Sequence, residues 1–344
     1  MKTPTRWTWA LLGMISLVAC GSNPPELTSR NPTTIAREAY ELRMAGEVDD
    51  AVRLLKAGLV AHPGAAVLHY ELARADLVLL DIEHSQSEAV AAVEYDPDDS
   101  EFRYFTALAS AYSLIDAAHH DDDERMKQMG HAVLDHLQTL LRNDPDHDRA
   151  RFLLVQQSVE MAPALGIEVD DLLPHVEYLE ARDPILGAKA RCCLVSRTEQ
   201  RKIWMRILEE YPDDVRAQVE AAEGLISVGR LVQADQCLRR AIEADPQNCY
   251  GLLRLGLAYA QRQDWSRAIE LTERYLQHEP PVALRAFAIG RLAVIHRRMG
   301  DTERADALER TAKDLDPHVW MTVMPPPLEV FTPIAPPARE PRKI

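Results

Sequence analysis

Residues 216–280 contain the same pattern twice, and this repeat constrains the fold more than any other feature of the chain. The first copy, RAQVEAAEGLISVGRLVQADQCLRRAIEADPQN, is followed directly by the second, CYGLLRLGLAYAQRQDWSRAIELTERYLQHEP. At a period of 34 residues, proline corresponds to proline and small residue to small residue, as in Pro246 and Pro280, Ala234 and Ala268, and Ala222 and Gly256. A repeat of this length predicts a solenoid, in which each unit packs against its neighbours.

Each unit is predicted to hold two amphipathic helices. Apolar residues recur with helical spacing on both sides of a break, which is Gly229 in the first copy. Small residues such as Ala234 and Ala268 are expected where the helices cross, because bulkier side chains would push the axes beyond about 8–10 Å. Pro246 and Pro280 end the second helices, since proline lacks a backbone donor and forces the preceding residue out of helical geometry.

The period, the small residues and the closing proline together resemble the tetratricopeptide repeat (TPR) family. Along the whole chain, closing prolines fall at Pro63, Pro97, Pro145, Pro184, Pro212, Pro246, Pro280 and Pro317. Their spacing is close to 34 residues near both ends of this series and becomes 48, 39 and 28 residues in the middle. The expected fold is therefore all-α: a right-handed α-solenoid of about eight TPR-like helix pairs over residues 32–317, irregular in the middle.

Composition agrees with a solenoid and excludes several classes of function. A chain of 344 residues with few glycines and 6% aromatic residues can lengthen repeat by repeat without enlarging one core. The net charge of −15 argues against nucleic acid as a partner. The sequence contains no glycine-rich phosphate loop, no G-x-S-x-G elbow and no H-E-x-x-H helix, so we expect no enzyme activity and no cofactor.

The first twenty residues predict a lipoprotein signal peptide. A positively charged start precedes the apolar residues 7–18, a run too short to span a bilayer comfortably. The ending Leu17-Val18-Ala19-Cys20 resembles the bacterial lipobox, in which the cysteine is lipid-modified and becomes the new first residue. An ordinary secretory signal and an uncleaved anchor are the alternatives. The resemblance implies a lipid anchor in the cell envelope, at the outer membrane facing the periplasm, because Gly21 stands where an aspartate would resemble an inner-membrane retention signal.

Two segments outside the repeats are predicted to be extended. Residues 21–31, with the sequence GSNPPELTSRN, are expected to form a flexible tether. Residues 318–344 contain seven prolines interleaved with apolar residues, which predicts a polyproline-like tail. This tail either docks on the inner face of the last two units or remains free.

The concave face is the surface most informative about function. In the TPR family it is lined by the first helix of each unit, so the resemblance implies partner contacts at Tyr40, Arg43, Tyr70, Arg74, Tyr250, Leu253, Leu257, Phe287 and Val294. Such a groove suits an extended peptide or a partner helix. The expected function is a protein-interaction scaffold in envelope assembly, secretion or transporter support. The alternative is a carrier of a small hydrophobic ligand in a closed cavity near Phe152, Leu173 and Trp204.

Two further groups of residues could support metal or thiol chemistry. Residues 119–123, HHDDD, have metal-ligand side chains, but five adjacent side chains diverge, so we expect a solvated turn that caps a helix beginning near Glu124. The cysteines beyond Cys20 are Cys192, Cys193, Cys237 and Cys249. None lies in a C-x-x-C motif, and free buried thiols are expected, although an exported location also permits disulfides.

Overall fold

The computed structural model describes residues 27–318 and Val330, and within them it contains α-helices arranged in antiparallel pairs and no strand. The pairs are α2 (Pro32–Ala45) with α3 (Val48–Ala61), α4 (Ala66–Val78) with α5 (Ile82–Tyr95), α6 (Ser100–His119) with α7 (Asp123–Asn143), α8 (Asp148–Leu165) with α9 (Leu173–Arg182), α10 (Pro184–Leu194) with α11 (Arg197–Glu210), α12 (Val215–Ser227) with α13 (Leu231–Ala244), α14 (Tyr250–Gln261) with α15 (Trp265–Leu276), and α16 (Val282–Arg298) with α17 (Thr302–Leu315). A short 3-10 helix, η1 (Val169–Leu172), precedes α9. The predicted all-α solenoid of helix pairs is confirmed.

The closing prolines mark the ends of the pairs as predicted. The second helix of every pair ends shortly before its proline; α3, for example, ends at Ala61, ahead of Pro63. Pro184 also occupies the first position of α10, where the Asp183 side chain accepts hydrogen bonds from the next two backbone amides. Proline is tolerated there because its missing N–H would have no helical partner. The fourth and fifth pairs therefore meet with almost no connecting loop.

Small residues lie at the helix crossings. Ala234 and Ala268 are fully buried. A Cβ on Gly256 would lie 2.8 Å from the Thr272 Oγ1 atom and 3.3 Å from the Ala268 carbonyl oxygen, so α14 and α15 approach more closely there than a side chain would allow. Gly229 follows the end of α12 with φ +77°, a conformation that favours glycine.

The longest interval of the repeat series is filled by longer helices. The 48-residue interval corresponds to α6 and α7, which have 20 and 21 residues. The HHDDD run spans the end of α6, the turn and the start of α7, and its acidic residues are exposed. The Asp122 side chain accepts a hydrogen bond from the Arg125 backbone amide and so caps α7, as the sequence predicted.

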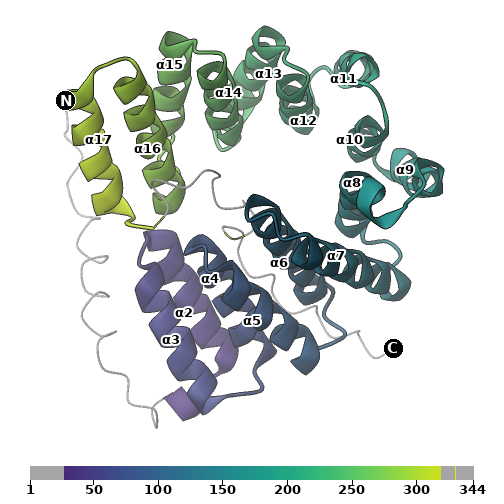
Figure 1. Ribbon diagram of the computed structural model, residues 1–344, viewed down its shortest axis with the longest axis vertical. Helices are drawn as coiled ribbons and strands as arrows, with labels where there is room; N and C mark the ends of the chain where they lie inside the picture. The colour runs from purple at the N-terminus through teal and green to yellow at the C-terminus, as the bar shows by residue number, and fades with distance from the viewer. Residues whose placement is uncertain (1–26, 319–329, 331–344) are drawn as a thin grey trace, which may run out of the picture.

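The solenoid curves until its last pair lies beside its first, which closes the chain into a ring (Figure 1). Even-numbered helices lie on the inner side and odd-numbered helices on the outer side. At the closure, a Cβ on Gly46 would lie 2.6 Å from Val282 Cγ1, and His318 Nε2 lies 3.6 Å from Asp49 Oδ2. One hydrophobic cluster accordingly includes buried residues from both ends of the solenoid.

The packed body begins earlier than predicted. Leu27 is fully buried, and its carbonyl oxygen lies 2.9 Å from His62 Nε2 on the first pair. Asn31 caps α2 by accepting a hydrogen bond from the Thr33 amide. Residues 27–31 are therefore part of the fold and not of a flexible tether, which corrects the predicted boundary. The predicted signal peptide, residues 21–26 and most of the predicted tail lie outside the described residues. No helix in the described part is long and apolar enough to cross a membrane.

The ring closure can be tested with two glycine substitutions. Gly46 and Gly300 have nearly equal φ angles of +88° and +87°, but a Cβ on Gly300 would meet nothing within 4 Å. Gly300→Ala should cost only the left-handed strain, about 1–2 kcal/mol. Gly46→Ala should cost about 1–3 kcal/mol more, because the new methyl group overlaps Val282. Urea denaturation of both variants measures the difference, and equal losses would show that the ends do not touch in solution.

Candidate functional site

The inner face of the first two pairs carries a cluster of aromatic and charged side chains. Helix α2 contributes Tyr40 and Arg43, and helix α4 contributes Tyr70, Glu71 and Arg74. Residues three or four positions apart lie on one side of a helix, so each helix presents its members to the same space. Because α2 and α4 contact each other directly, the five side chains meet. We call this cluster the Arg43 patch.

Glu71 lies between the two arginines of the patch and pairs with both. Its Oε2 accepts a hydrogen bond from Arg43 Nη2 at 2.8 Å, and its Oε1 accepts one from Arg74 Nη1 at 2.5 Å. All three side chains are 1% exposed or less. Two positive charges and one negative charge are therefore buried together.

Tyrosine rings lie beside both guanidinium groups. Arg43 Cζ is 5.2 Å from the centroid of the Tyr40 ring, and Arg74 Cζ is 5.2 Å from that of Tyr70. These distances allow cation–π attraction, which is stronger where water is excluded. Tyr70 in turn packs on Phe102 of α6, with ring centroids 4.8 Å apart. The third helix pair therefore helps to position the patch.

Arg43 has donor capacity that the described residues do not use. Its Nε and Nη1 atoms are buried and have no hydrogen-bond partner among those residues. Burial lowers the pKa of the Arg43 guanidinium, and the attraction of Glu71 opposes that shift. An unsatisfied buried donor costs roughly 1–3 kcal/mol. The patch is therefore suited to a ligand that supplies acceptor atoms.

The C-terminal region supplies one such acceptor. The Val330 backbone oxygen accepts a hydrogen bond from Arg74 Nη2 at 3.2 Å. The Val330 side chain is fully buried and belongs to the same hydrophobic cluster as Tyr70. Val330 itself has 3-10 geometry, and its carbonyl and aliphatic side chain are groups that a bound peptide presents to a groove. The patch thus already holds one residue with that chemistry.

Sequence reasoning identified four members of the patch and missed the fifth. Tyr40, Arg43, Tyr70 and Arg74 were predicted on the inner face, and the structure brings them together; their contact with a partner stays a prediction. Glu71 was missed. Its role was not visible in the sequence, because only the structure shows that α4 is buried at every position from Tyr70 onward and that the buried charge requires a partner.

The other five predicted contact residues do not form an open apolar wall. Leu253 on α14 and Phe287 on α16 are fully buried. Tyr250, Leu257 and Val294 are half-buried. Consecutive inner helices contact each other along this part of the ring and cover much of the predicted surface. Leu253 and Phe287 therefore serve as core residues, which corrects the prediction.

The side chains predicted to enclose an apolar cavity do not converge in the described part of the chain. Trp204 is 2% exposed and packs against Gly224, where a Cβ would lie 1.8 Å from its Nε1 atom. Phe152 packs against a different hydrophobic cluster, and Leu173 is half-buried. A small-ligand carrier therefore lacks the shared cavity on which that alternative depended.

The four described cysteines are free thiols, as predicted. Burial raises the pKa of Cys192 to about 12 and that of Cys193 to about 11. Burial also raises the pKa of Cys237 and of Cys249. These thiols stay protonated at neutral pH and are poor nucleophiles. Cys20, the predicted lipidation site, lies outside the described residues.

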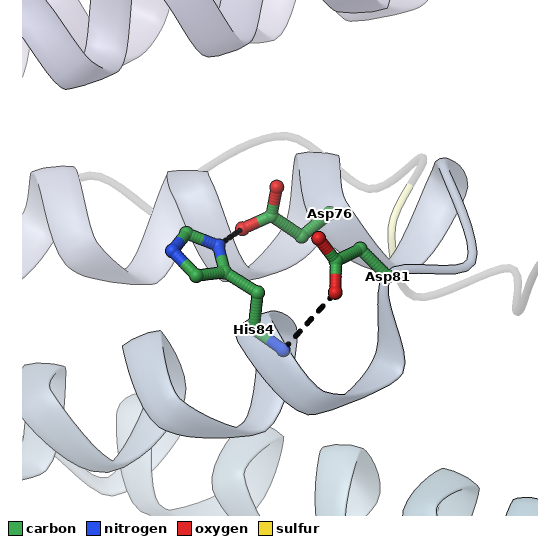
Figure 2. Close-up of side chains that lie close together, drawn as sticks. All are labelled: Asp76, Asp81 and His84. Atoms are coloured by element: carbon green, nitrogen blue, oxygen red, sulfur yellow. Dashed lines mark hydrogen bonds and ion pairs between the residues drawn. The ribbon is translucent and has the colours of Figure 1, made fainter.

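A second polar cluster lies between α4 and α5 and contains side chains of metal-ligand type. Figure 2 shows Asp76, Asp81 and His84, whose potential ligand atoms all lie within 4.8 Å of one another. His84 Nδ1 is 2.6 Å from Asp76 Oδ2, and the His84 backbone amide donates to Asp81 Oδ1 at 3.3 Å. Asp81 is the N-cap of α5. These contacts account for the cluster as a clamp between two helices.

The clamp extends along α5 through Glu88. His84 Nε2 lies 3.5 Å from Glu88 Oε1, and Glu88 Oε2 lies 2.6 Å from His69 Nδ1 on α4. The hydrogen bond to Glu88 raises the pKa of His69. Burial raises the pKa of Asp76 to about 6, against the hydrogen bond from His84, which favours the carboxylate. The polar groups between α4 and α5 are thus linked in one chain of contacts.

Comparison with known proteins identifies a repeat within this solenoid. Residues 219–283 match the family described as tetratricopeptide repeat. No curated protein sequence matches the chain significantly. The solved structures to which it is similar include a thermophilic TPR protein from Thermus thermophilus, with TM-score 0.43, 20% identity, and coverage of 66% of this chain and 98% of that one.

Two further solved structures are similar to this chain. One is a tetratricopeptide repeat protein from Parabacteroides merdae, with TM-score 0.39, 15% identity, and coverage of 82% of this chain and 92% of that one. The other is YrrB, described as a TPR protein with an unusual peptide-binding site, with TM-score 0.27, 14% identity, and coverage of 65% of this chain and 91% of that one.

The clamp predicts a pH dependence of stability that Asp76→Asn should remove. Because the folded-state pKa of Asp76, about 6, lies above its ordinary value of 3.8, folding favours the protonated acid. The contribution of Asp76 to the free energy of unfolding is complete below about pH 4 and is lost as the pH rises through about 6. Its total is about 2–3 kcal/mol. Urea unfolding from pH 4 to 7 measures it. The exposed Asp98→Asn is the control, and parallel curves for wild type and Asp76→Asn would contradict the prediction.

Proposed function

We propose that this protein is a membrane-anchored, non-enzymatic scaffold that binds an extended segment of a protein partner at the Arg43 patch. The tetratricopeptide repeat match at residues 219–283 supports a scaffold, because stacked repeats of this kind present long surfaces to other proteins. A repeat is specific for fold and weak for function. The binding site is therefore assigned from the chemistry of the patch.

The observation that carries the proposal is the buried Arg43–Glu71–Arg74 cluster. An ion cluster of this kind is a poor way to stabilise a fold, because desolvation of the charges offsets much of their attraction. Both Glu71 oxygens are engaged by the arginines, while Arg43 keeps two buried donor atoms without partners in the described residues. A segment that brings backbone carbonyls or a carboxylate would satisfy these donors.

The predicted lipid anchor would hold the patch close to a membrane. Cys20 is only seven residues before Leu27, which is packed in the first pair. At about 3.3–3.6 Å per extended residue, that connection spans at most about 25 Å. The first two pairs, which carry the patch, are therefore the part of the ring nearest the proposed anchor. Envelope assembly, secretion and transporter support would each use a partner held at this distance.

Site-specific photo-crosslinking in cells tests the binding site. A crosslinker at half-buried Tyr40 should give a defined adduct with a partner, whereas one at Val232, which is 68% exposed on the outer helix α13, should not. Arg43→Met keeps the Glu71 and Arg74 pair but removes the spare donors, and it should weaken the adduct about tenfold, equal to about 1.4 kcal/mol. Equal adduct yields from Tyr40 and Val232, unchanged by Arg43→Met, would contradict the proposal.

The anchor is tested by Cys20→Ser. Loss of the lipidated thiol should leave the protein unprocessed or release it from the membrane fraction, and mass spectrometry of the N-terminal peptide reports both outcomes. Cys192→Ser, which changes a buried thiol in α10, is the matched control and should leave fractionation unchanged. Acylated protein of mature size that remains on membranes after Cys20→Ser would contradict the assignment.

A further inference from the structure

We infer that the chain carries its own competing ligand for the Arg43 patch: the C-terminal segment at Val330 occupies the patch, and a partner binds by displacing it. This inference rests on the proposed function and specifies the ligand. The segment recognised is a peptide that places an aliphatic side chain in the ring and offers backbone carbonyls to the arginines.

Val330 makes the contacts expected of a bound peptide residue. Its side chain is fully buried, although it lies beyond the last helix of the solenoid. Its carbonyl oxygen accepts from Arg74 Nη2 at 3.2 Å, a contact between residues 256 positions apart. Recognition through a backbone carbonyl does not depend on the side chain of the residue, so a partner segment can reproduce it.

Arg43 has donor atoms that Val330 does not satisfy. Arg43 Nε and Nη1 remain buried without a hydrogen-bond partner among the described residues. Both carboxylate oxygens of Glu71 are already held by arginines, so the patch offers no free acid to a basic partner. A ligand with additional carbonyls or a carboxylate would therefore make contacts that Val330 does not make. This difference lets a partner displace the segment.

The connection between the ring and Val330 favours an intramolecular occupant. His318 is positioned at the ring closure, with its Nε2 atom 3.6 Å from Asp49 Oδ2. Val330 follows His318 by only twelve positions, and a short tether gives an effective concentration on the order of millimolar. For a free peptide that competes with it, the apparent affinity is the intrinsic affinity multiplied by the fraction of molecules in which the patch is empty. Weakening the Val330 contact should therefore increase the affinity for added peptide.

The experiment uses the full chain and a fluorescent peptide with the sequence of residues 325–335, PPPLEVFTPIA. Fluorescence anisotropy measures its binding to wild type, to Val330→Asp and to Val330→Ala. Val330→Asp should bind the peptide at least about tenfold more tightly than wild type, because a buried carboxylate expels the segment. Val330→Ala, which is milder, should give a smaller gain, so the result does not depend on one variant. Val232→Asp makes the same substitution on the exposed outer face and should behave as wild type.

The peptide itself provides the second control. A peptide in which the valine is replaced by aspartate should not bind any of the proteins. Equal affinity for wild type and for both Val330 variants would overturn the inference, as would failure of the native peptide to bind any of them. Neither result removes the proposed function: an adduct from Tyr40 that depends on Arg43 would still identify the patch as a partner site. If neither the Tyr40 adduct nor the gain in peptide affinity is observed, the two proposals are rejected together.

Discussion

The stacking of helix pairs across small residues is the interaction on which the rest of the structure depends. Ala222, Ala234 and Ala268 are fully buried, and Gly256 allows α14 and α15 to approach more closely than a Cβ would permit. Each pair buries its apolar face only against its neighbours, so a small rotation between consecutive pairs accumulates along the chain. Across the described helix pairs this rotation brings the last pair against the first (Figure 1).

Ring closure changes what the inner face can do. In an open solenoid, the first and last helix pairs would not touch each other. Here one hydrophobic cluster includes buried residues from both ends of the described chain, whereas the burial of Leu253 and Phe287 comes from contacts between consecutive inner helices. Closure also places the end of the last pair beside the first, where His318 approaches Asp49. The C-terminal region therefore starts within reach of α2 and α4.

Helix α4 connects the two polar clusters of the molecule. Glu71 pairs toward the inner face with Arg74 of its own helix and with Arg43 of α2, while Asp76 contacts His84 of α5. Polar groups on a buried helix are tolerated only when each finds a partner, since an unpaired buried charge costs several kcal/mol. The clamp satisfies this requirement within the fold. The Arg43 patch does so only in part, and the donors left on Arg43 are the reason to assign binding there.

The sequence by itself determined the helix pairs and their ends, because the signals are local: apolar spacing, small residues, and a proline such as Pro63 just after the helix. It also predicted four of the five patch residues from their place in each first helix. Closure of the ring, the pairing of Glu71 and the burial of Val330 were decided only by the tertiary structure. Closure depends on many small rotations between pairs, and the contact between Arg74 and Val330 joins positions 256 residues apart. No local sequence pattern predicts that these two residues meet, because their relative position depends on every helix crossing between them.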